Sequence, residues 1–219
     1  MPKSRTSSIR SNSVAEPLRR DFYTRDVVDV ARELIGKTLR RDSVVLRITE
    51  TEAYRWPPDT ASHARVGRTA RTEPLFGPPG HAYVYLCYGI HHMLNVVTGH
   101  DGQAQAVLIR ACKPVEGLEV LEERRGGRSG PSLLDGPGKV GQALGIDTSW
   151  SHHDVTSATG LWVGPGTPPS RLLVGERVGI DYALPEHREL PWRFAEADSR
   201  WVSHRKTLRP LDAAETMPV

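Results

Sequence analysis

The sequence predicts a single α+β domain, a mixed domain built on a curved antiparallel sheet with surrounding helices. Three observations predict it. Several strand-like alternations follow one another along the chain, turns containing glycine join some of them, and helix-like segments come at intervals instead of after every strand. A chain of 219 residues, 38% of them hydrophobic and 25% charged, is also long enough to bury one sizeable core.

One domain over residues 17–209 is expected, because no internal repeat or low-complexity linker interrupts the middle of the chain. Residues 1–16 are predicted to form a loose basic tail, and residues 210–219 a loose C-terminal tail. The N-terminal tail lacks the apolar segment of a secretory signal, and no apolar run reaches the roughly 18 residues that a membrane span needs. With only two cysteines, a cytoplasmic location is predicted.

The first elements of the domain are predicted to be a helix and a strand. Apolar residues recur at helical spacing from Thr24, the expected N-cap, to Gly36, the expected end. Residues 44–53 then alternate between apolar and polar, as a strand does. Glu50 and Glu52 continue the apolar face of this strand. Two carboxylates are therefore expected on a face that otherwise packs into the core.

The remaining elements follow from turn residues and hydrophobic spacing. They are expected in this order: a long irregular loop over 56–80, strands over 82–88, 93–98 and 104–112, helices over 115–125 and 139–144, and a strand over 170–182. The three consecutive strands indicate an antiparallel meander. A loop as long as the first one is often functional in a compact domain.

Glu52 is the first candidate for chemistry. A carboxylate on the apolar face, at a strand end that enters a long loop, can be partly desolvated yet reachable, which suits a general base. Glu50 shares that face and is its rival, and a surface strand end is the alternative. Arg110 lies among apolar strand residues and needs a partner there. Glu52 could be that partner, holding a hydrolytic water with Arg110, or the two could form a purely structural ion pair.

Several aromatic and amide side chains could contact a ligand. Tyr83 and Tyr85 share one strand face, where core packing alone would bury them. Tyr88 precedes a glycine at a turn, so it would be presented outward and could enter a base stack. Asn95 is either a satisfied core amide or a group that reads a ligand edge.

A metal site is not predicted, although the chain has nine histidines. No pair of them shows the His-Glu-x-x-His spacing, and the adjacent histidines at 91–92 would point to opposite faces of a strand. Residues 136–139 lack the spacing of a nucleotide phosphate loop. A helix start that binds one DNA phosphate near Lys139 is the expected alternative.

An ordered set of motifs then becomes specific. It comprises Glu-Thr-Glu-Ala-Tyr at 50–54, Ser62-His63, Gly-Pro-Pro-Gly at 77–80, Tyr83-Val84-Tyr85 with Tyr88-Gly89, Asn95-Val96-Val97, Leu108-Ile109-Arg110-Ala111, Pro-Val-Glu-Gly at 114–117, and Gly136-Pro137 with Gln142-Ala143-Leu144. This set closely resembles the alkyladenine (3-methyladenine) DNA glycosylase family, over roughly residues 19–205. Several motifs in the same order make a chance match very improbable.

The resemblance implies a monofunctional glycosylase of base excision repair, without metal or cofactor. Such an enzyme flips a damaged purine, of the 3-methyladenine, 7-methylguanine, hypoxanthine or ethenoadenine class, out of duplex DNA and hydrolyses its N-glycosidic bond. The implied roles are a general base at Glu52 with Arg110 helping to hold water, a base-stacking pocket at Tyr54, His63 and Tyr85, an intercalating wedge at Tyr88, and steric exclusion of guanine at Asn95.

Double-stranded DNA containing damaged purines is the expected partner, bound by a monomer. The net charge of +3 agrees with a polyanion but decides little. Lys139, Arg65 and Arg68 are the predicted contacts to the DNA backbone, and Glu73 adds an acid where relatives tend to be more neutral. Two other classes remain open: a noncatalytic damaged-DNA binding protein, and a metal-dependent hydrolase that a chelator would inactivate.

Overall fold

The computed structural model describes residues 16–212 and 214–218. The strands are β1 Thr38–Arg41, β2 Val44–Trp56, β3 Ala82–Cys87, β4 His91–Val97, β5 Ala104–Glu116, β6 Leu161–Gly164, β7 Leu172–Gly175, β8 Arg193–Glu196 and β9 Arg209–Pro210. The α-helices are α1 Arg20–Tyr23, α2 Val27–Leu34, α3 Leu118–Arg124, α4 Pro137–Leu144 and α5 Pro185–Arg188. Short 3-10 helices, among them η1 His63–Val66 and η2 Glu73–Phe76, lie in the loops.

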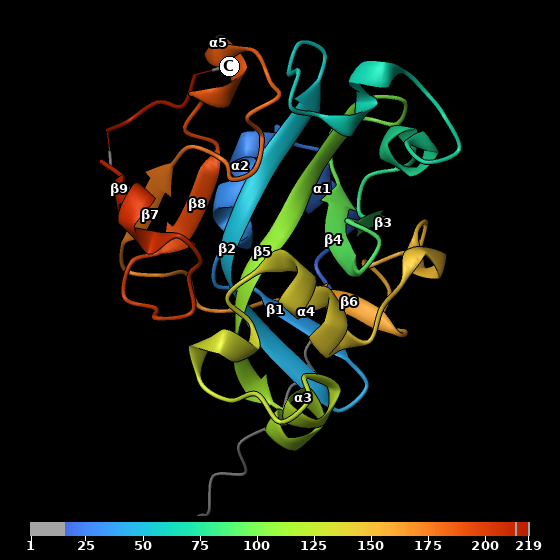
Figure 1. Cartoon of the computed structure of the whole chain (residues 1–219). Helices are drawn as coiled ribbons and strands as arrows, with labels where there is room; N and C mark the ends of the chain where they lie inside the picture. The colour runs from blue at the N-terminus through green and yellow to red at the C-terminus, as the bar shows by residue number, and fades with distance from the viewer. Residues whose placement is uncertain (1–15, 213, 219) are drawn as a thin grey trace, which may run out of the picture.

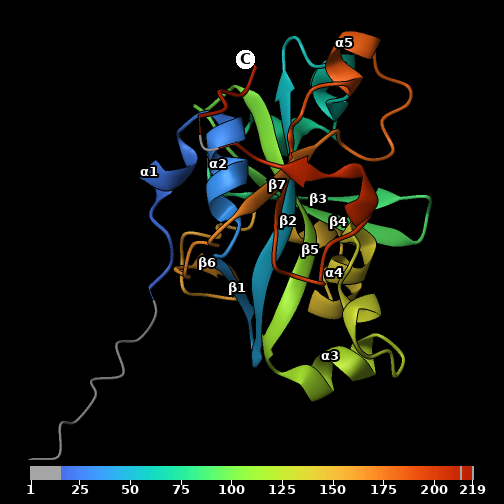
Figure 2. The ribbon, with the colours of Figure 1, turned by 90° about the vertical axis from the view of Figure 1, so that its left-hand side faces the viewer.

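The described strands form one antiparallel sheet with the order β3-β4-β5-β2-β8-β7-β9, and β1 joins β2 to β6. The long strands β2 and β5 run side by side through the middle of the molecule (Figure 1). Helices α2 and α4 lie on opposite sides of this pair (Figure 2). The predicted α+β class is therefore confirmed, and so is the predicted meander, which is β3-β4-β5.

An irregularity in β2 changes which face its residues occupy. Ile48 pairs with Cys112, but the register with β5 shifts on either side of Glu50. As a result, Thr51 follows Ile48 onto the side of α2, where its hydroxyl donates to the carbonyl oxygen of Ala31 at 2.8 Å. A bulge of this kind turns the following side chains to the other face. Glu50 and Glu52 therefore leave the apolar face, contrary to the prediction from alternation.

Strand β2 also continues beyond its predicted end. It was expected to end at residue 53, with Glu52 at a strand terminus, but it runs on to Trp56. The long β5 partner supplies the reason, because Tyr54 and Trp56 pair with Ala106 and Ala104. Glu52 thus sits on a fixed strand in the interior of the sheet, which constrains its position more tightly than a loop would.

Two helix starts differ from the predictions. Asp26, and not Thr24, caps α2, because its carboxylate accepts from the backbone N–H of Val28 at 2.8 Å. The helix predicted from residue 115 begins at Leu118 instead. Gly117 separates it from β5 with φ +77°, and a Cβ there would lie 2.7 Å from the carbonyl oxygen of Ser43. Only glycine fits this sharp change of direction without strain.

The predicted strand over 170–182 is wrong in its second half. Only Leu172–Gly175 forms a strand, β7, and residues 176–182 leave the sheet as a loop that crosses toward Glu52. The backbone N–H of Val178 in this loop donates to the Glu52 carboxylate instead of to a neighbouring strand. The pairing of β7 with β8 ends at Gly175, and the charged residues Glu176 and Arg177 follow directly.

Helix α4 packs unusually close to β4. A Cβ added to Gly141 would collide with the carbonyl oxygen of His92, so this position admits only glycine. The helix thereby supports the base of the β3–β4 hairpin, and its first residue, Pro137, reaches the cavity described below. Glycine weakens an isolated helix, but here it permits the contact that holds the hairpin.

Of the two predicted tails, the structure describes most of the C-terminal one and only residue 16 of the N-terminal one. Residues 1–15 of the predicted basic tail lie outside the described residues. At the other end, Leu211 donates its N–H to the carbonyl oxygen of Leu172, and Trp192 donates to the carbonyl oxygen of Pro218 at 3.1 Å. None of the described helices is long and apolar enough to cross a membrane.

Candidate active site

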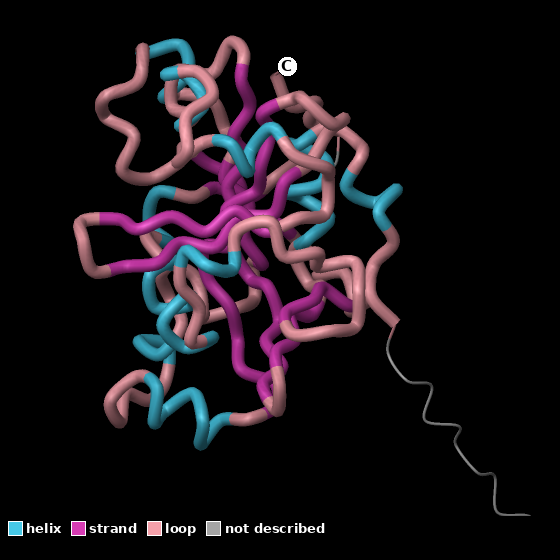
Figure 3. The backbone as a smooth tube through the Cα atoms, turned by 90° about the vertical axis from the view of Figure 1, so that its right-hand side faces the viewer, coloured by secondary structure: helices cyan, strands magenta, loops and turns pink. Residues whose placement is uncertain are grey.

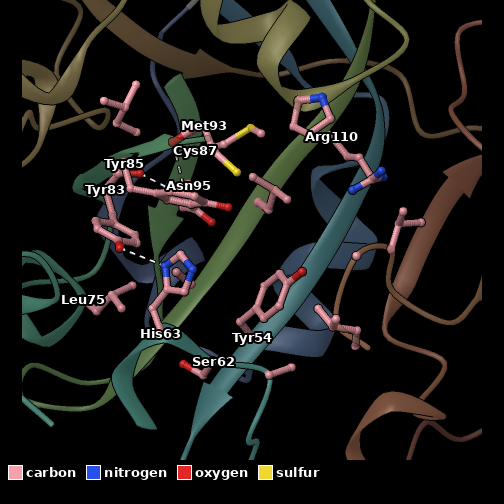
Figure 4. A pocket seen from close by; sticks show the side chains of 18 of the residues that line it. Tyr54, Ser62, His63, Leu75, Tyr83, Tyr85, Cys87, Met93, Asn95 and Arg110 are labelled. Carbon is pink, nitrogen blue, oxygen red and sulfur yellow. Dashed lines mark hydrogen bonds between the residues drawn. The ribbon is translucent and has the colours of Figure 1, made fainter. Parts of the chain in front are cut away.

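A cavity of about 640 Å³ opens beside β2, β3, β4 and β5. The predicted ligand residues that line it are Tyr54, His63, Tyr85, Tyr88, Asn95 and Arg110. Figure 4 shows Tyr54, His63 and Tyr85 with their rings gathered around the hollow, and Arg110 at its far side. The sheet positions these side chains because alternate residues of three neighbouring strands face the same way.

The carboxylate of Glu52 is fully buried directly behind this lining. Its Oε1 accepts from the backbone N–H of Val178 at 2.8 Å and lies 3.3 Å from Nη1 of Arg110. Its Oε2 accepts from the Tyr54 hydroxyl at 2.8 Å. Both Arg110 and Tyr54 line the cavity, so Glu52 is connected to the cavity through the two groups that touch it.

Glu50, the rival carboxylate, is held differently. Its oxygens accept from the backbone N–H of Ser203 at 2.7 Å and from the Ser203 hydroxyl at 3.0 Å. Arg193 approaches to 3.2 Å and Arg110 to 3.3 Å. Burial raises the pKa of Glu50, although these donors and cations oppose the rise. The partners of Glu50 are therefore a backbone N–H, a buried hydroxyl and two cations.

The guanidinium of Arg110 joins the two carboxylates. Burial by itself would lower the pKa of Arg110, but the charges of Glu52 and Glu50 outweigh it and the pKa is raised. The side chain is only 7% exposed. The prediction that Arg110 lies on the same strand face as Ala106 and Leu108 agrees with the structure, since all three line the cavity.

The aromatic part of the cavity contains a neutral histidine. The rings of His63 and Tyr85 meet edge to face with centroids 4.5 Å apart. Burial, together with the charges of Arg71 and Arg65, lowers the pKa of His63 from 6.5 to about 4. Burial raises the pKa of Tyr83 to about 12, so its hydroxyl keeps its proton, and it forms a hydrogen bond of 3.0 Å with Nδ1 of His63.

Asn95 lies at the bottom of the aromatic cavity and is 4% exposed. Its side-chain nitrogen donates to the carbonyl oxygen of Tyr83 at 3.1 Å. This bond fixes the amide on the neighbouring strand, in register between Tyr83 and Leu108. The side chain therefore forms a rigid wall of the cavity.

Tyr88 occupies the tip of the β3–β4 hairpin, which projects from the body of the molecule (Figure 3). Its side chain is 87% exposed and its φ is +51°, a value that non-glycine residues rarely adopt. Ile90 beyond it is 71% exposed. Two large apolar side chains are thus exposed at this tip, and Tyr88 also lines the cavity.

The three cations predicted to contact DNA do not line the cavity. Arg68 pairs with Glu73 at 2.8 Å, and Lys139 pairs with Asp135 at 2.6 Å. Arg65 lies over the ring of Tyr182, 4.5 Å from its centroid. Surface pairs of this kind are weak enough to be exchanged for a phosphate.

Residues far along the chain complete the site, and the sequence analysis missed them. Arg177 and Asp59, both fully buried, form an ion pair of 2.5 Å, and the Arg177 guanidinium lies 4.7 Å from the centroid of the Tyr54 ring. Val178 and Ser203 hold the two glutamates. The charged Glu176-Arg177 pair directly after an apolar run marks the strand end and could have located this loop.

No group of three or more His, Cys, Asp or Glu side chains in residues 16–212 and 214–218 is arranged to hold a metal ion. The adjacent histidines at 91–92 and 152–153 do not meet in one such group there.

Comparison with known proteins agrees with this architecture. Residues 21–200 match the family model described as methylpurine-DNA glycosylase. The chain is 61% identical over 189 residues to a putative 3-methyladenine DNA glycosylase of Nitrosococcus oceani, covering 86% of this chain and 94% of that protein. It is 55% identical over 213 residues to a DNA-3-methyladenine glycosylase of Arabidopsis thaliana, covering 96% of this chain and 82% of that protein.

The chain is therefore an enzyme of DNA repair, a DNA glycosylase. More specifically, it belongs to the methylpurine-DNA glycosylase family.

Proposed function

We propose that this chain is a monofunctional glycosylase of base excision repair. Its substrates are alkylated or deaminated purines in duplex DNA, of the 3-methyladenine, 7-methylguanine, hypoxanthine and ethenoadenine class. The observation that carries the mechanism is the buried Glu52–Arg110 pair directly behind an aromatic cavity. The names of the relatives, 3-methyladenine DNA glycosylases, support the substrate class.

The damaged nucleotide is flipped into the cavity, where its base stacks among Tyr54, His63 and Tyr85. Flipping costs a few kcal/mol, and stacking on aromatic side chains returns about 1–3 kcal/mol per base, so the two terms are of similar size. The exposed ring of Tyr88 occupies the gap in the duplex. Because His63 is neutral at pH 7, it does not repel a positively charged alkylated base.

Hydrolysis requires a water on Glu52. Both carboxylate oxygens have protein partners, but the Tyr54 hydroxyl belongs to a cavity-lining side chain and can yield its place, whereas Val178 donates from the backbone. The water oxygen then bonds to C1′ of the sugar, the bond to the base breaks, and a water proton passes to Glu52. The carboxylate also stabilises the oxocarbenium character of the sugar. A neutral base such as hypoxanthine additionally needs a proton to leave.

DNA binding by a monomer, through Lys139, Arg65 and Arg68, completes the proposal. Arg65 lies on η1 and Lys139 on α4, and phosphates would replace the present carboxylate partners of Arg68 and Lys139. No metal or cofactor takes part in the proposed reaction.

The first test compares the unmodified protein with Glu52→Gln on a duplex containing one hypoxanthine and on alkylated DNA. Base release is scored by alkaline cleavage, with EDTA present. We expect release to continue in EDTA and to fall by about 10²- to 10⁴-fold in Glu52→Gln, because the general base is lost while lesion binding is kept.

Glu196→Gln is the matched control, since Glu196 on β8 is also ion-paired, to Arg47 at 2.7 Å, without contacting Glu52 or the cavity. It should excise at the unmodified rate. Excision by Glu52→Gln at that rate would sink the assignment of the base, and loss of all activity in EDTA would favour a metal-dependent hydrolase.

A further inference from the structure

Ser203 stands where the buried charges of the site meet. Its hydroxyl accepts from Nε of Arg110 at 2.9 Å and donates to Oε1 of Glu50 at 3.0 Å. Its backbone N–H donates to the other Glu50 oxygen at 2.7 Å. The side chain is nearly buried, the residue being 7% exposed, and it lies beyond residues 21–200, which match the family model.

The buried charges near Ser203 come from two carboxylates and two guanidinium groups, and they balance only when all four are counted: Glu50, Glu52, Arg110 and Arg193. Glu50 and Glu52 are two fully buried carboxylates on the same side of β2, and one guanidinium cannot neutralise both. Arg193, also fully buried, supplies the second positive charge to Glu50 at 3.2 Å. Buried charges persist when they are paired and hydrogen-bonded in this way. Arg193 therefore leaves Arg110 available for Glu52.

The two carboxylates face different nitrogens of Arg110: Nε lies 3.3 Å from Oε1 of Glu50, and Nη1 lies 3.3 Å from Oε1 of Glu52. The hydroxyl of Ser203 is nearer to Nε than Glu50 is, and it accepts the Nε hydrogen bond at 2.9 Å. It binds Nε and so directs Nη1 toward Glu52 and the cavity. A planar guanidinium held at one nitrogen has its other donors fixed in direction.

We propose that Ser203 is a positioning residue for excision, which acts by orienting Arg110 beside Glu52. The inference rests on the proposed function, because it needs Glu52 and Arg110 to carry the reaction. Ser203 touches neither the cavity nor the substrate, so its removal should change the rate of the chemical step and leave lesion binding alone.

The experiment measures single-turnover excision of hypoxanthine from a duplex, together with the Kd for a duplex carrying an uncleavable lesion analogue. Ser203→Ala should lower the excision rate by about tenfold, equivalent to about 1.4 kcal/mol of transition-state stabilisation, with Kd unchanged. Ser203→Thr keeps the hydroxyl and should restore most of the rate. Ser199→Ala is the matched control: Ser199 is 8% exposed in the same segment, and its hydroxyl accepts from the backbone N–H of Trp201 instead of from a charged group of the site.

A double-mutant cycle with Arg110→Lys separates positioning from general support of the fold. Lysine keeps the charge but has no Nε–H for Ser203 to hold. If Ser203 acts through Arg110, Ser203→Ala should have little further effect on the rate in the Arg110→Lys background. An equal loss in both backgrounds, or a parallel loss of binding and thermal stability, would overturn the proposal.

The rates of Glu52→Gln and Ser203→Ala distinguish a failure of this inference from a failure of the proposed function. If Glu52→Gln abolishes excision while Ser203→Ala excises at the unmodified rate, only the role of Ser203 is wrong. If Glu52→Gln itself excises normally, the proposed mechanism fails and Ser203 has no Arg110–Glu52 pair to position.

Discussion

At the scale of single residues, the site works through charge and protonation states that burial sets. Glu50 and Glu52 are only two positions apart, yet their surroundings give them different parts. Glu50 is held by Ser203 and Arg193, whereas Glu52 shares a hydrogen bond with the Tyr54 hydroxyl at the cavity. The same reasoning applies to His63, because burial lowers its pKa and keeps its own ring uncharged at neutral pH.

The lowered pKa of His63 predicts a pH-dependent stability. In the unfolded chain the imidazole takes up a proton below its usual pKa of 6.5, but in the folded protein it does so only near 4. The unfolded state therefore binds more protons between these values, and stability falls as the pH falls through that window. Between pH 7 and pH 5 this group should cost roughly 2 kcal/mol of unfolding free energy.

Urea unfolding at both pH values checks this for the unmodified protein and His63→Gln. The variant should lose less stability on acidification, by roughly 2 kcal/mol. The exposed His100 provides the control, and His100→Gln should behave like the unmodified protein. The assignment is wrong if His63→Gln and the unmodified protein lose equal stability.

At the scale of elements, the β3–β4 hairpin combines a buried base with an exposed tip. Its base is fixed by β5 on one side and by α4, through the close approach at Gly141, on another. Its tip carries Tyr88 and Ile90 into water. A rigid base and an apolar tip suit an element that enters a duplex without changing shape.

Replacing Tyr88 should therefore affect duplex substrates selectively. Tyr88→Ala should reduce excision from a duplex by roughly tenfold to a hundredfold, because about 1–3 kcal/mol of stacking is lost. Excision from a single strand, which has no gap to fill, should stay unchanged. Tyr88→Phe keeps the ring and serves as the matched control.

Thermal unfolding should show that Tyr88→Ala changes stability by less than about 0.5 kcal/mol, since the side chain is exposed. Equal losses on duplex and single strand would contradict the role of a wedge and indicate a contact with the base itself.

At the scale of the whole molecule, the sheet brings distant parts of the chain to one cavity. Glu52, Arg110, Val178 and Ser203 come from four separate segments and meet behind the aromatic side chains. With a net charge of only +3, we expect local ion pairs, more than an overall field, to govern the proposed contacts with phosphates. Glu73 and Arg68 form one such ion pair, and Glu73 also lies 3.1 Å from Nε2 of His152.

Glu73→Gln should tighten DNA binding at low salt by releasing Arg68. If one further phosphate contact forms, the slope of log K against log salt should steepen by about 0.9. Fluorescence anisotropy over a salt series measures it. The double variant Glu73→Gln with Arg68→Gln should return the slope to that of the unmodified protein. Asp198→Asn, which breaks the ion pair of Asp198 with Arg171, is the control. An unchanged slope in Glu73→Gln would mean that Arg68 does not reach the DNA.

The sequence by itself determined the α+β class, the meander and the main candidates for the site. Hydrophobic alternation and turn residues are local properties, so β3, β4 and β5 could be located from them. The motifs around Glu52, Tyr85 and Arg110 identified the family, because several of them occur in one order.

Only the tertiary structure decided which face of the sheet those residues occupy and which groups hold their side chains. The bulge in β2 reverses the parity of Glu50 and Glu52, and a one-residue irregularity leaves no mark in an alternation pattern. Val178 and Ser203 contact the two glutamates although more than a hundred residues separate them in the sequence. Both contacts use backbone N–H groups, which every residue except proline carries. No local pattern records such contacts, because the fold alone brings these groups to the two carboxylates.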